Sequence, residues 1–456
     1  MLDLARAVQG VGGAVMFATS LALIAEAFQG RERGTAFGIY GAVIGGAVAI
    51  GPLLGGAITS GIGWRWIFFV NVPIGVIAVI VTLARVDKSK ERTRRRVDWL
   101  GFLSFSTSLF LLILALVRAD TDGWGSPLIV GLFCGGATLL AVFIVTEMRR
   151  RDPMLDLSLF RRPAMVGVSV AALAISASIF ALFLYLTLFI QDDLGYGPFA
   201  AGLRFLPVSM LAFAVAPVAG KLTVRVHARY ILGTGLLIAG VGCALMTLVG
   251  TSSGWLALLP GLVVGGTGIG LVNPALASSA VAVVEPEHAG MASGANNTFR
   301  QVGIATGIAA LGSVFESQVR KKVTDTLLSS PAGAAAIRQH GATLGPALAS
   351  GEVRTVTRRL PPAQSVAVLH AYRVGFAYSL DHLVVIAAVI AFVGAILCYW
   401  LVRQRDFVTA GHGGPPGGGG EWHGGDGSGG GGGDQTPEAP GGDGAGAGTV
   451  RMPTPA

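Results

Sequence analysis

Polar side chains inside long apolar stretches are the residues of this chain that can carry chemistry. Arg6 lies in an apolar stretch that runs from about residue 4 to residue 28. An arginine at the centre of a membrane-spanning helix costs about 2.5–3.5 kcal/mol, so it normally faces the interior of a helix bundle or a water-filled cavity. In such a place Arg6 would act as a permanent positive charge. The alternative is that Arg6 extends to the membrane surface, because it lies near the first residue.

Amide side chains form a second group of candidates. Asn and Gln within apolar stretches hydrogen-bond to neighbouring helices or line a cavity. The sequence leaves both roles open, and helix-to-helix hydrogen bonding is the preferred one. The residues of this group are Gln9, Asn71, Asn273, Asn296, Asn297 and Gln301.

Patterns typical of enzymes do not fit. Gly266, Gly268 and Gly270 resemble part of a dinucleotide-binding loop, but the third glycine has the wrong spacing and the run lies in an apolar stretch. The sequence contains no P-loop pattern for ATP, and its three cysteines match no metal-binding spacing. We therefore predict no enzymatic activity, no catalytic residue and no metal site.

The composition places the chain in a lipid bilayer. Hydrophobic residues make up 52%, charged residues 13%, and the mean hydropathy is +0.66, whereas soluble domains carry about 25% charged residues. Apolar stretches of about 20 residues cross the hydrocarbon layer as helices, because backbone groups in lipid need partners within their own segment. We predict an all-α integral membrane protein with eleven spans, at about 4–28, 34–60, 65–86, 98–117, 127–147, 163–190, 199–220, 229–250, 255–283, 289–315 and 377–402.

The net charge of +8 follows the predicted topology and does not form a nucleic-acid-binding patch. Lys and Arg cluster after odd-numbered spans, as in 85–96 and 149–162, whereas the loops after even-numbered spans carry few. By the positive-inside rule the chain starts outside and its C-terminus is cytoplasmic. The loop after the ninth span, with Glu285 and Glu287, is an exception. We predict the bilayer as a partner and no nucleic acid, and the oligomeric state stays open.

An internal repeat organises the chain. At an offset of 256 positions, residues 10–14 lie over 266–270 and residues 34–38 over 290–294, with matching glycines. Such a repeat favours a duplicated helical bundle. The predicted parts are a partial N-terminal bundle of three helices (1–86), two linking helices with basic loops (87–162), a six-helix bundle (163–402) with a long outward loop (316–376), and a disordered Gly/Pro-rich cytoplasmic tail (403–456).

The second apolar span carries the sharpest motif. Gly41 and Gly45 are four residues apart, as are Gly51 and Gly55, so these glycines let another backbone approach one helix face closely. Pro52 removes a backbone donor and loosens the helix. The motif serves either static packing or a hinge at which two bundles rock.

These residues resemble the drug:proton antiporters of the major facilitator superfamily, in the branch with fourteen helices. The fifth-helix signature of that family is matched by Gly38, Gly51, Pro52, Gly55 and Gly56, with Ala47 in place of the middle glycine. The fourth-helix signature is matched by Leu2, Arg6, Gln9, Gly10, Gly12, Gly13 and Ala14. Further matches to the branch are Asp98, Trp99, Gly101, Arg300 and Gln301.

The resemblance implies a function and a set of site residues. It implies proton-coupled efflux of small hydrophobic drugs or secondary metabolites by alternating access, with a proton gradient and no bound cofactor. The proton-coupling and cavity candidates are then Arg6, Gln9, Arg300 and Gln301, and the cavity-lining candidates are Asn71, Asn273, Asn296 and Asn297.

Two alternatives stay open. One is a proton-coupled solute symporter with the same fold. The other is a truncated, transport-inactive fragment or assembly partner, because the family has three helices before the position of Met1, and the internal repeat predicts about 90 residues for them.

Overall fold

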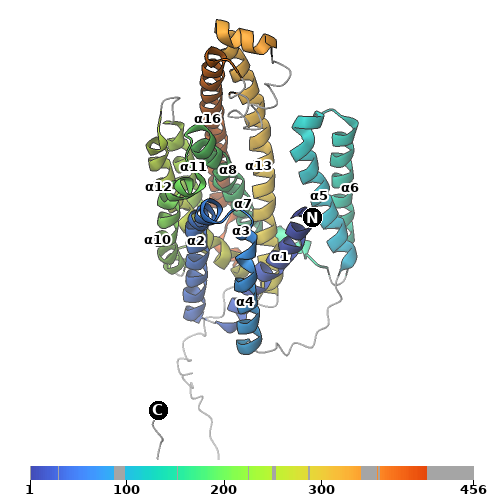
Figure 1. Cartoon of the computed structure of the whole chain (residues 1–456). Coiled ribbons are helices and arrows are strands. Elements are labelled where there is room, and N and C mark those ends of the chain that lie inside the picture. The colour runs from blue at the N-terminus through green and yellow to red at the C-terminus, as the bar shows by residue number, and fades with distance from the viewer. Residues whose placement is uncertain are drawn as a thin grey trace, which may run out of the picture. The chain divides into compact units, whose positions relative to one another are not determined.

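The computed structural model describes residues 2–28, 30–86, 98–150, 153–223, 225–248, 253–285, 288–339, 357 and 360–407. Every regular element within these ranges is helical (Figure 1). Residues 1–410 form one compact unit. The predicted disordered tail, beyond residue 407, lies outside the described residues.

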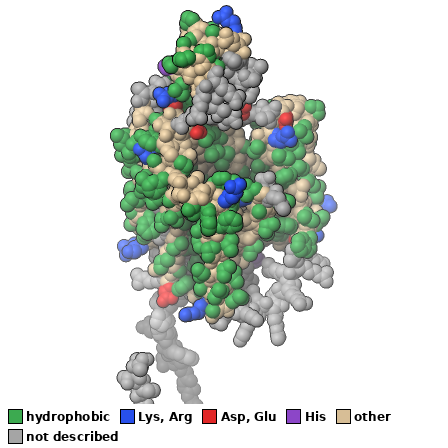
Figure 2. Space-filling view, in the orientation of Figure 1, with side chains coloured by type: hydrophobic (Ala, Val, Ile, Leu, Met, Phe, Trp, Pro, Cys, Tyr) green, Lys and Arg blue, Asp and Glu red, His purple; other side chains and the backbone are tan. Residues whose placement is uncertain are grey.

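The first part of the chain forms long apolar helices where spans are predicted. These are α1 (Leu2–Ala27), α2 (Gly30–Gly61), the short α3 (Trp66–Phe69) and α4 (Asn71–Arg85). None of the residues of α4 is buried, although its sequence is almost wholly apolar. Hydrophobic side chains also cover most of the face shown in Figure 2. Exposed apolar surface on this scale is expected where lipid is the solvent.

Helices α5 (Trp99–Asp122) and α6 (Pro127–Arg149) form an antiparallel hairpin, and α5 packs against α13 (Figure 1). Each helix begins at a side-chain cap, since Asp98 accepts a hydrogen bond from the Gly101 N–H and Ser126 accepts one from the Ile129 N–H. Such caps satisfy backbone donors that have no partner within the helix. Gly123, with φ of 87°, ends α5 and opens the turn.

The C-terminal bundle contains the main buried core. Its helices are α7 (Pro163–Ile175) continued through η2 (Ser176–Phe180), α8 (Ala181–Leu188) and η3 (Phe189–Asp193); α9 (Pro198–Arg204); α10 (Leu206–Leu222); α11 (Ala228–Leu245); α12 (Leu259–Ala282); α13 (Ala289–Leu328); and α16 (Pro362–Leu401). Fully buried side chains such as Leu182, Leu236 and Phe376 fill its centre. Helices α9 and α10 meet at a bend of 43°.

The helices agree with the predicted spans in place and type. Among the described residues, eight helices are long and apolar enough to cross a membrane, or nine if the bent pair α9–α10 counts as one span. The two other predicted spans correspond to α1 and α2, which have 26 and 32 residues and contain side chains that the structure does not describe.

Two predicted boundaries differ from the structure. The outward loop 316–376 is helical at both ends, because α13 continues to Leu328 and α16 already begins at Pro362. Residues 404–407, placed in the tail, begin with a short 3-10 helix, η7 (Gln404–Asp406). Asp406 Oδ2 accepts a hydrogen bond of 3.2 Å from the backbone N–H of Ala164, at the start of α7. The bundle therefore extends past residue 402.

Candidate functional site

A seam runs between the first two helices and the C-terminal bundle. Helix α2 packs along α9 and α10 and also contacts α12, while α1 packs against α13. Tyr40 of α2 and Ile24 of α1 pack on a buried cluster of Ala277, Val281 and Ala289. We call this contact zone between α1–α2 and α9, α10, α12 and α13 the seam.

Backbones approach each other very closely at one end of the seam. A Cβ atom added at Gly202 of α9 would lie 2.5 Å from the carbonyl oxygen of Pro52 in α2. A Cβ atom at Gly56 of α2 would likewise lie 2.5 Å from the carbonyl oxygen of Pro198. Ser60 Oγ also accepts a hydrogen bond of 3.3 Å from the Phe199 N–H. Reciprocal glycines therefore set the spacing between α2 and α9.

Other positions of the glycine motif behave differently. Gly41 lies against Pro274 of α12, whose Cγ would be 2.7 Å from an added Cβ, and Gly46 lies against the Phe213 ring. Gly51 and Gly55 have open space where a Cβ would be. Gly38 lies within α2, and its surroundings are outside the described residues. Among the motif glycines whose surroundings the structure describes, Gly41, Gly46 and Gly56 are closely packed, whereas Gly51 and Gly55 are not.

Arg300 reaches into the seam from α13. Its Cζ lies 5.9 Å from the ring centroid of Phe180 in η2, within the range of a cation–π interaction. Tyr40 of α2 lies close enough to contribute to the electrostatic environment of the guanidinium. The Tyr40 hydroxyl in turn lies 3.5 Å from Ser20 Oγ of α1. Arg300 therefore lies on the side of α13 where Tyr40 and Ser20 of the first two helices are its neighbours.

Two buried amides lie in the helices that form the C-terminal side of the seam. Asn296, one turn before Arg300, is 5% exposed, and Asn273 of α12 is 4% exposed. The Oδ1 atoms of both are buried and have no hydrogen-bond donor among the described residues. An unsatisfied buried acceptor costs about 1–3 kcal/mol. Each oxygen can therefore accept a hydrogen bond from a water or a solute.

The remaining candidates lie elsewhere or have local partners. Arg6 is exposed, donates a 3.0 Å hydrogen bond to Gln9 Oε1, and stands 5.6 Å from the Phe68 ring centroid. Asn71 is exposed and donates to the carbonyl oxygen of Ile67 in the preceding turn. Asn297 is half-buried, and Gln301 is exposed. The structure thus places Arg300, Asn296 and Asn273 on α12 and α13, two of the helices that form the C-terminal side of the seam, and pairs Arg6 with Gln9.

Sequence reasoning missed Phe180, Tyr40 and Gly202. Phe180 ends the π-helical turn η2, and single π-helical turns within α-helices are frequent at functional sites. A π turn has no clear sequence signal inside an apolar span. Tyr40 lies between the glycines of the α2 motif, and this position is the one signal that could have singled it out.

A partly open pocket of about 440 Å³ lies between helices of the C-terminal bundle. Helices α7, α13 and α16 form its walls, with Phe299 and Leu173 among its apolar lining residues. Its lining offers van der Waals contact to an apolar group.

Comparison with known proteins finds one matching family and several similar transport and resistance proteins. A family model described as Major Facilitator Superfamily matches residues 1–308. Puromycin resistance protein pur8 of Streptomyces alboniger is 36% identical over 357 residues, which cover 77% of this chain and 70% of that protein. Multidrug resistance protein Stp of Mycobacterium tuberculosis is 34% identical over 315 residues, covering 69% and 58%. The probable actinorhodin transporter of Streptomyces coelicolor is 32% identical over 327 residues, covering 69% and 56%. The chain therefore spans less than two thirds of the length of the last two proteins.

Proposed function

This chain belongs to the major facilitator superfamily, and from that membership we propose that it exports small hydrophobic compounds across the membrane in exchange for protons. The chain is a multi-pass membrane protein, so the bilayer is its solvent and a small molecule is its substrate. Transport would proceed by alternating access, in which α1–α2 and the C-terminal bundle move relative to each other at the seam.

The position of Arg300 is the observation that carries the proposal. A permanent cation within a membrane-spanning helix is retained where it faces a pathway or a wet cavity. Arg300 lies against Phe180 within the C-terminal bundle and near Tyr40 on the other side of the seam. Asn296, with its unpaired oxygen, is one turn away on the same helix. Aromatic, amide and cationic groups on one pathway suit a mainly apolar substrate with a few polar groups.

The substrate class is inferred from the relatives. Their names refer to resistance to puromycin, resistance to several drugs, and transport of actinorhodin. We infer that this chain takes compounds of the same kind, which are antibiotics or other secondary metabolites of moderate size. The cytoplasmic C-terminus and the proton as coupling ion belong to the same proposal, and the charge distribution of the loops supports the orientation.

Inside-out vesicles that contain the full chain test the proposal. An imposed acidic interior should drive uptake of a fluorescent hydrophobic cation, and a protonophore should abolish the uptake. Vesicles with the Arg300→Ala variant at equal protein level are the matched control, and should show uptake near that of empty vesicles. Equal uptake by vesicles with and without the protein would contradict transport by this chain. That result is the one that the inactive-fragment hypothesis predicts. Uptake that needs the opposite gradient would instead favour a symporter.

A further inference from the structure

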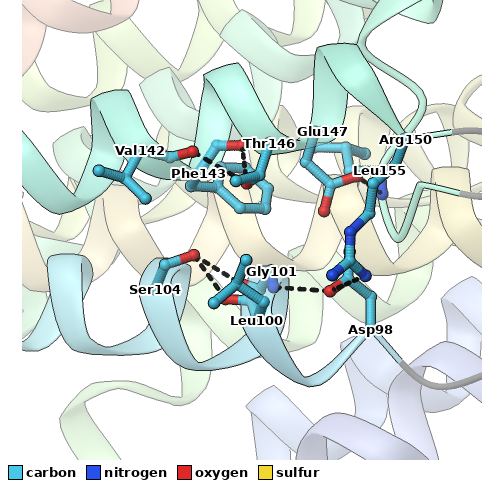
Figure 3. Close-up of polar contacts among 10 residues, drawn as sticks. All are labelled: Asp98, Leu100, Gly101, Ser104, Val142, Phe143, Thr146, Glu147, Arg150 and Leu155. Atoms are coloured by element: carbon cyan, nitrogen blue, oxygen red, sulfur yellow. Dashed lines mark hydrogen bonds and ion pairs between the residues drawn. The ribbon is translucent and has the colours of Figure 1, made fainter.

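Two carboxyl groups meet where the α5–α6 hairpin joins the segment that leads to α7. Asp98 caps the first turn of α5, and Glu147 lies in the last turn of α6 and points toward the start of α5 (Figure 3). They are 6% and 3% exposed, respectively. Carboxyl groups are almost never buried to this extent without partners that balance their charge.

One oxygen of each carboxyl group has its partners. Asp98 Oδ1 accepts from the Gly101 N–H at 2.8 Å and pairs with Arg150 Nη1 at 2.6 Å. Glu147 Oε2 accepts from the Leu155 N–H at 3.3 Å. The other two oxygens, Asp98 Oδ2 and Glu147 Oε1, are buried and have no donor among the described residues.

These two unpaired oxygens face the same point in space. A Cβ atom added at Gly101 would meet both of them, and it would lie 2.9 Å from Asp98 Oδ2. Asp98 is also close enough to act on Glu147 as a neighbouring like charge. Ionised carboxylates only accept hydrogen bonds, so a hydrogen bond between two carboxyl groups needs a proton on one of them.

The charges around the two carboxyl groups also favour a state in which the pair carries one proton. Directly after α6, Arg150 contributes one positive charge, and its bond goes to Asp98. From the segment after α6, the backbone N–H groups of Met154 and Leu155 face Glu147. The nearby Asp156 carboxylate is engaged with Ser158, Arg162 and His288. With a single proton on the carboxyl pair, Asp98, Glu147 and Arg150 together carry no net charge, which lowers the cost of burying them.

We propose that Asp98 and Glu147 form a proton-binding carboxyl pair, separate from the seam, which holds one shared proton and thereby holds the α5–α6 hairpin to the segment leading into α7. The proton comes from water and binds between Asp98 Oδ2 and Glu147 Oε1. Loss of the proton leaves two buried like charges against each other, and this repulsion destabilises the junction between the hairpin and that segment. The segment 153–156 also contacts α13, where Met291 Sδ accepts from the Asp156 N–H.

Infrared spectroscopy of the full chain in lipid nanodiscs tests the pair directly. The wild-type chain at neutral pH should show a carbonyl-stretch band of a buried protonated carboxylic acid, which disappears when the pH is raised. The band should be absent in Glu147→Gln and in Asp98→Asn. It should remain in Asp122→Asn, a control at the other end of α5, where Asp122 pairs with Arg118 at 2.9 Å. A wild-type spectrum without this band at neutral pH would overturn the proposal.

Thermal unfolding supplies a second, independent measurement. The side-chain amide introduced by Glu147→Gln can donate to Asp98 and accept from the Leu155 N–H, so this variant should melt at the wild-type temperature at neutral pH. At alkaline pH it should keep that temperature while the wild-type chain melts several degrees lower. A variant that melts below the wild type at neutral pH, or does not fold, would show that Glu147 is ionised and would contradict the shared proton.

Discussion

Gly202 of α9 lies directly against the carbonyl oxygen of Pro52 in α2, and a Cβ atom added at Gly202 would be 2.5 Å from that oxygen. The reciprocal contact is that of Gly56 in α2 with the carbonyl oxygen of Pro198, the first residue of α9. Two glycines, one on each side of the seam, thus let two backbones approach each other more closely than any other residue type would allow. The contact joins α2 to the C-terminal bundle.

Alanine in place of either contact glycine should lower the stability of the chain, whereas alanine at the neighbouring motif glycines should not. Gly56→Ala and Gly202→Ala should each destabilise the chain by about 1–3 kcal/mol, because a backbone carbonyl cannot move aside like a flexible side chain. Gly51→Ala and Gly55→Ala, where a Cβ meets open space, should keep the wild-type melting temperature. Thermal unfolding in detergent measures all four. Equal losses at all four positions would refute the assigned contacts.

Arg300 should be needed for transport and Gln301 should not. Replacing Arg300 with Ala removes the cation that faces Phe180 and Tyr40, so vesicle uptake should fall at least about tenfold, equivalent to about 1.4 kcal/mol. Gln301 is the next residue and is exposed, so Gln301→Ala should leave uptake unchanged. Both variants need equal protein levels in the membrane. Similar uptake by the two variants would remove Arg300 from the pathway.

The unpaired amides allow stability and transport to be separated. Asn273→Leu removes a buried acceptor without a donor, so the melting temperature should stay the same or rise. If the oxygen binds a solute or a pathway water, uptake should fall in the same variant. Asn296→Leu should behave in the same way. Loss of stability in both variants would indicate that these amides serve as helix-to-helix contacts, which the sequence alone also allows.

Asp156 gives the chain an acid-sensitive contact outside the membrane-spanning helices. Hydrogen bonds from the Ser158 side chain, and from its N–H at 2.9 Å, lower the pKa of Asp156 below its ordinary value of 3.8. A lowered pKa in the folded state stabilises the fold at pH values above 3.8, and this contribution is lost as the pH falls through the lowered pKa.

Asp156→Asn should therefore melt below the wild type at neutral pH, and the difference should shrink as the pH falls below 3.8. Ser158→Ala should reproduce part of the change. A difference between wild type and Asp156→Asn that grows on acidification would have the wrong sign and would refute this account.

The sequence predicts the helices well because hydrophobic length is a local property. Each predicted apolar span coincides with a helix, from α1 at Leu2 to α16 at Leu401. Family motifs also lead to α2 and to Arg300. The extensions of α13 to Leu328 and of α16 from Pro362 were missed. Those segments are more polar than a membrane span, and a helix outside the bilayer needs no continuous apolar run.

The partners of the site residues could not be predicted in the same way. Gly51, Gly55 and Gly56 look equivalent in the sequence, yet only Gly56 meets a backbone, because the register of α2 against α9 is a tertiary property. Glu147, at the end of the predicted span 127–147, is buried beside Asp98, and nothing in the spacing of the sequence indicates that partner. Arg6 has Gln9 as its partner, one turn along the same helix. In each case the partner of the residue is set by how the helices pack, and hydropathy and residue spacing do not specify that packing.

Relative motion at the seam is the central claim, and a reversible crosslink across it is the most direct test. The Ser60 hydroxyl accepts a hydrogen bond from the backbone N–H of Phe199 there, so the two positions are adjacent. Ser60→Cys with Phe199→Cys, in a chain whose Cys134, Cys243 and Cys398 are replaced by Ala, can therefore be joined by a short reducible crosslinker. The matched control joins Gln339→Cys to Gln364→Cys, a contact outside the seam.

Crosslinking positions 60 and 199 should abolish proton-driven uptake in vesicles, and reduction should restore it, whereas crosslinking the control pair should leave uptake unchanged. Full uptake by a chain that is completely crosslinked between positions 60 and 199 would contradict the account.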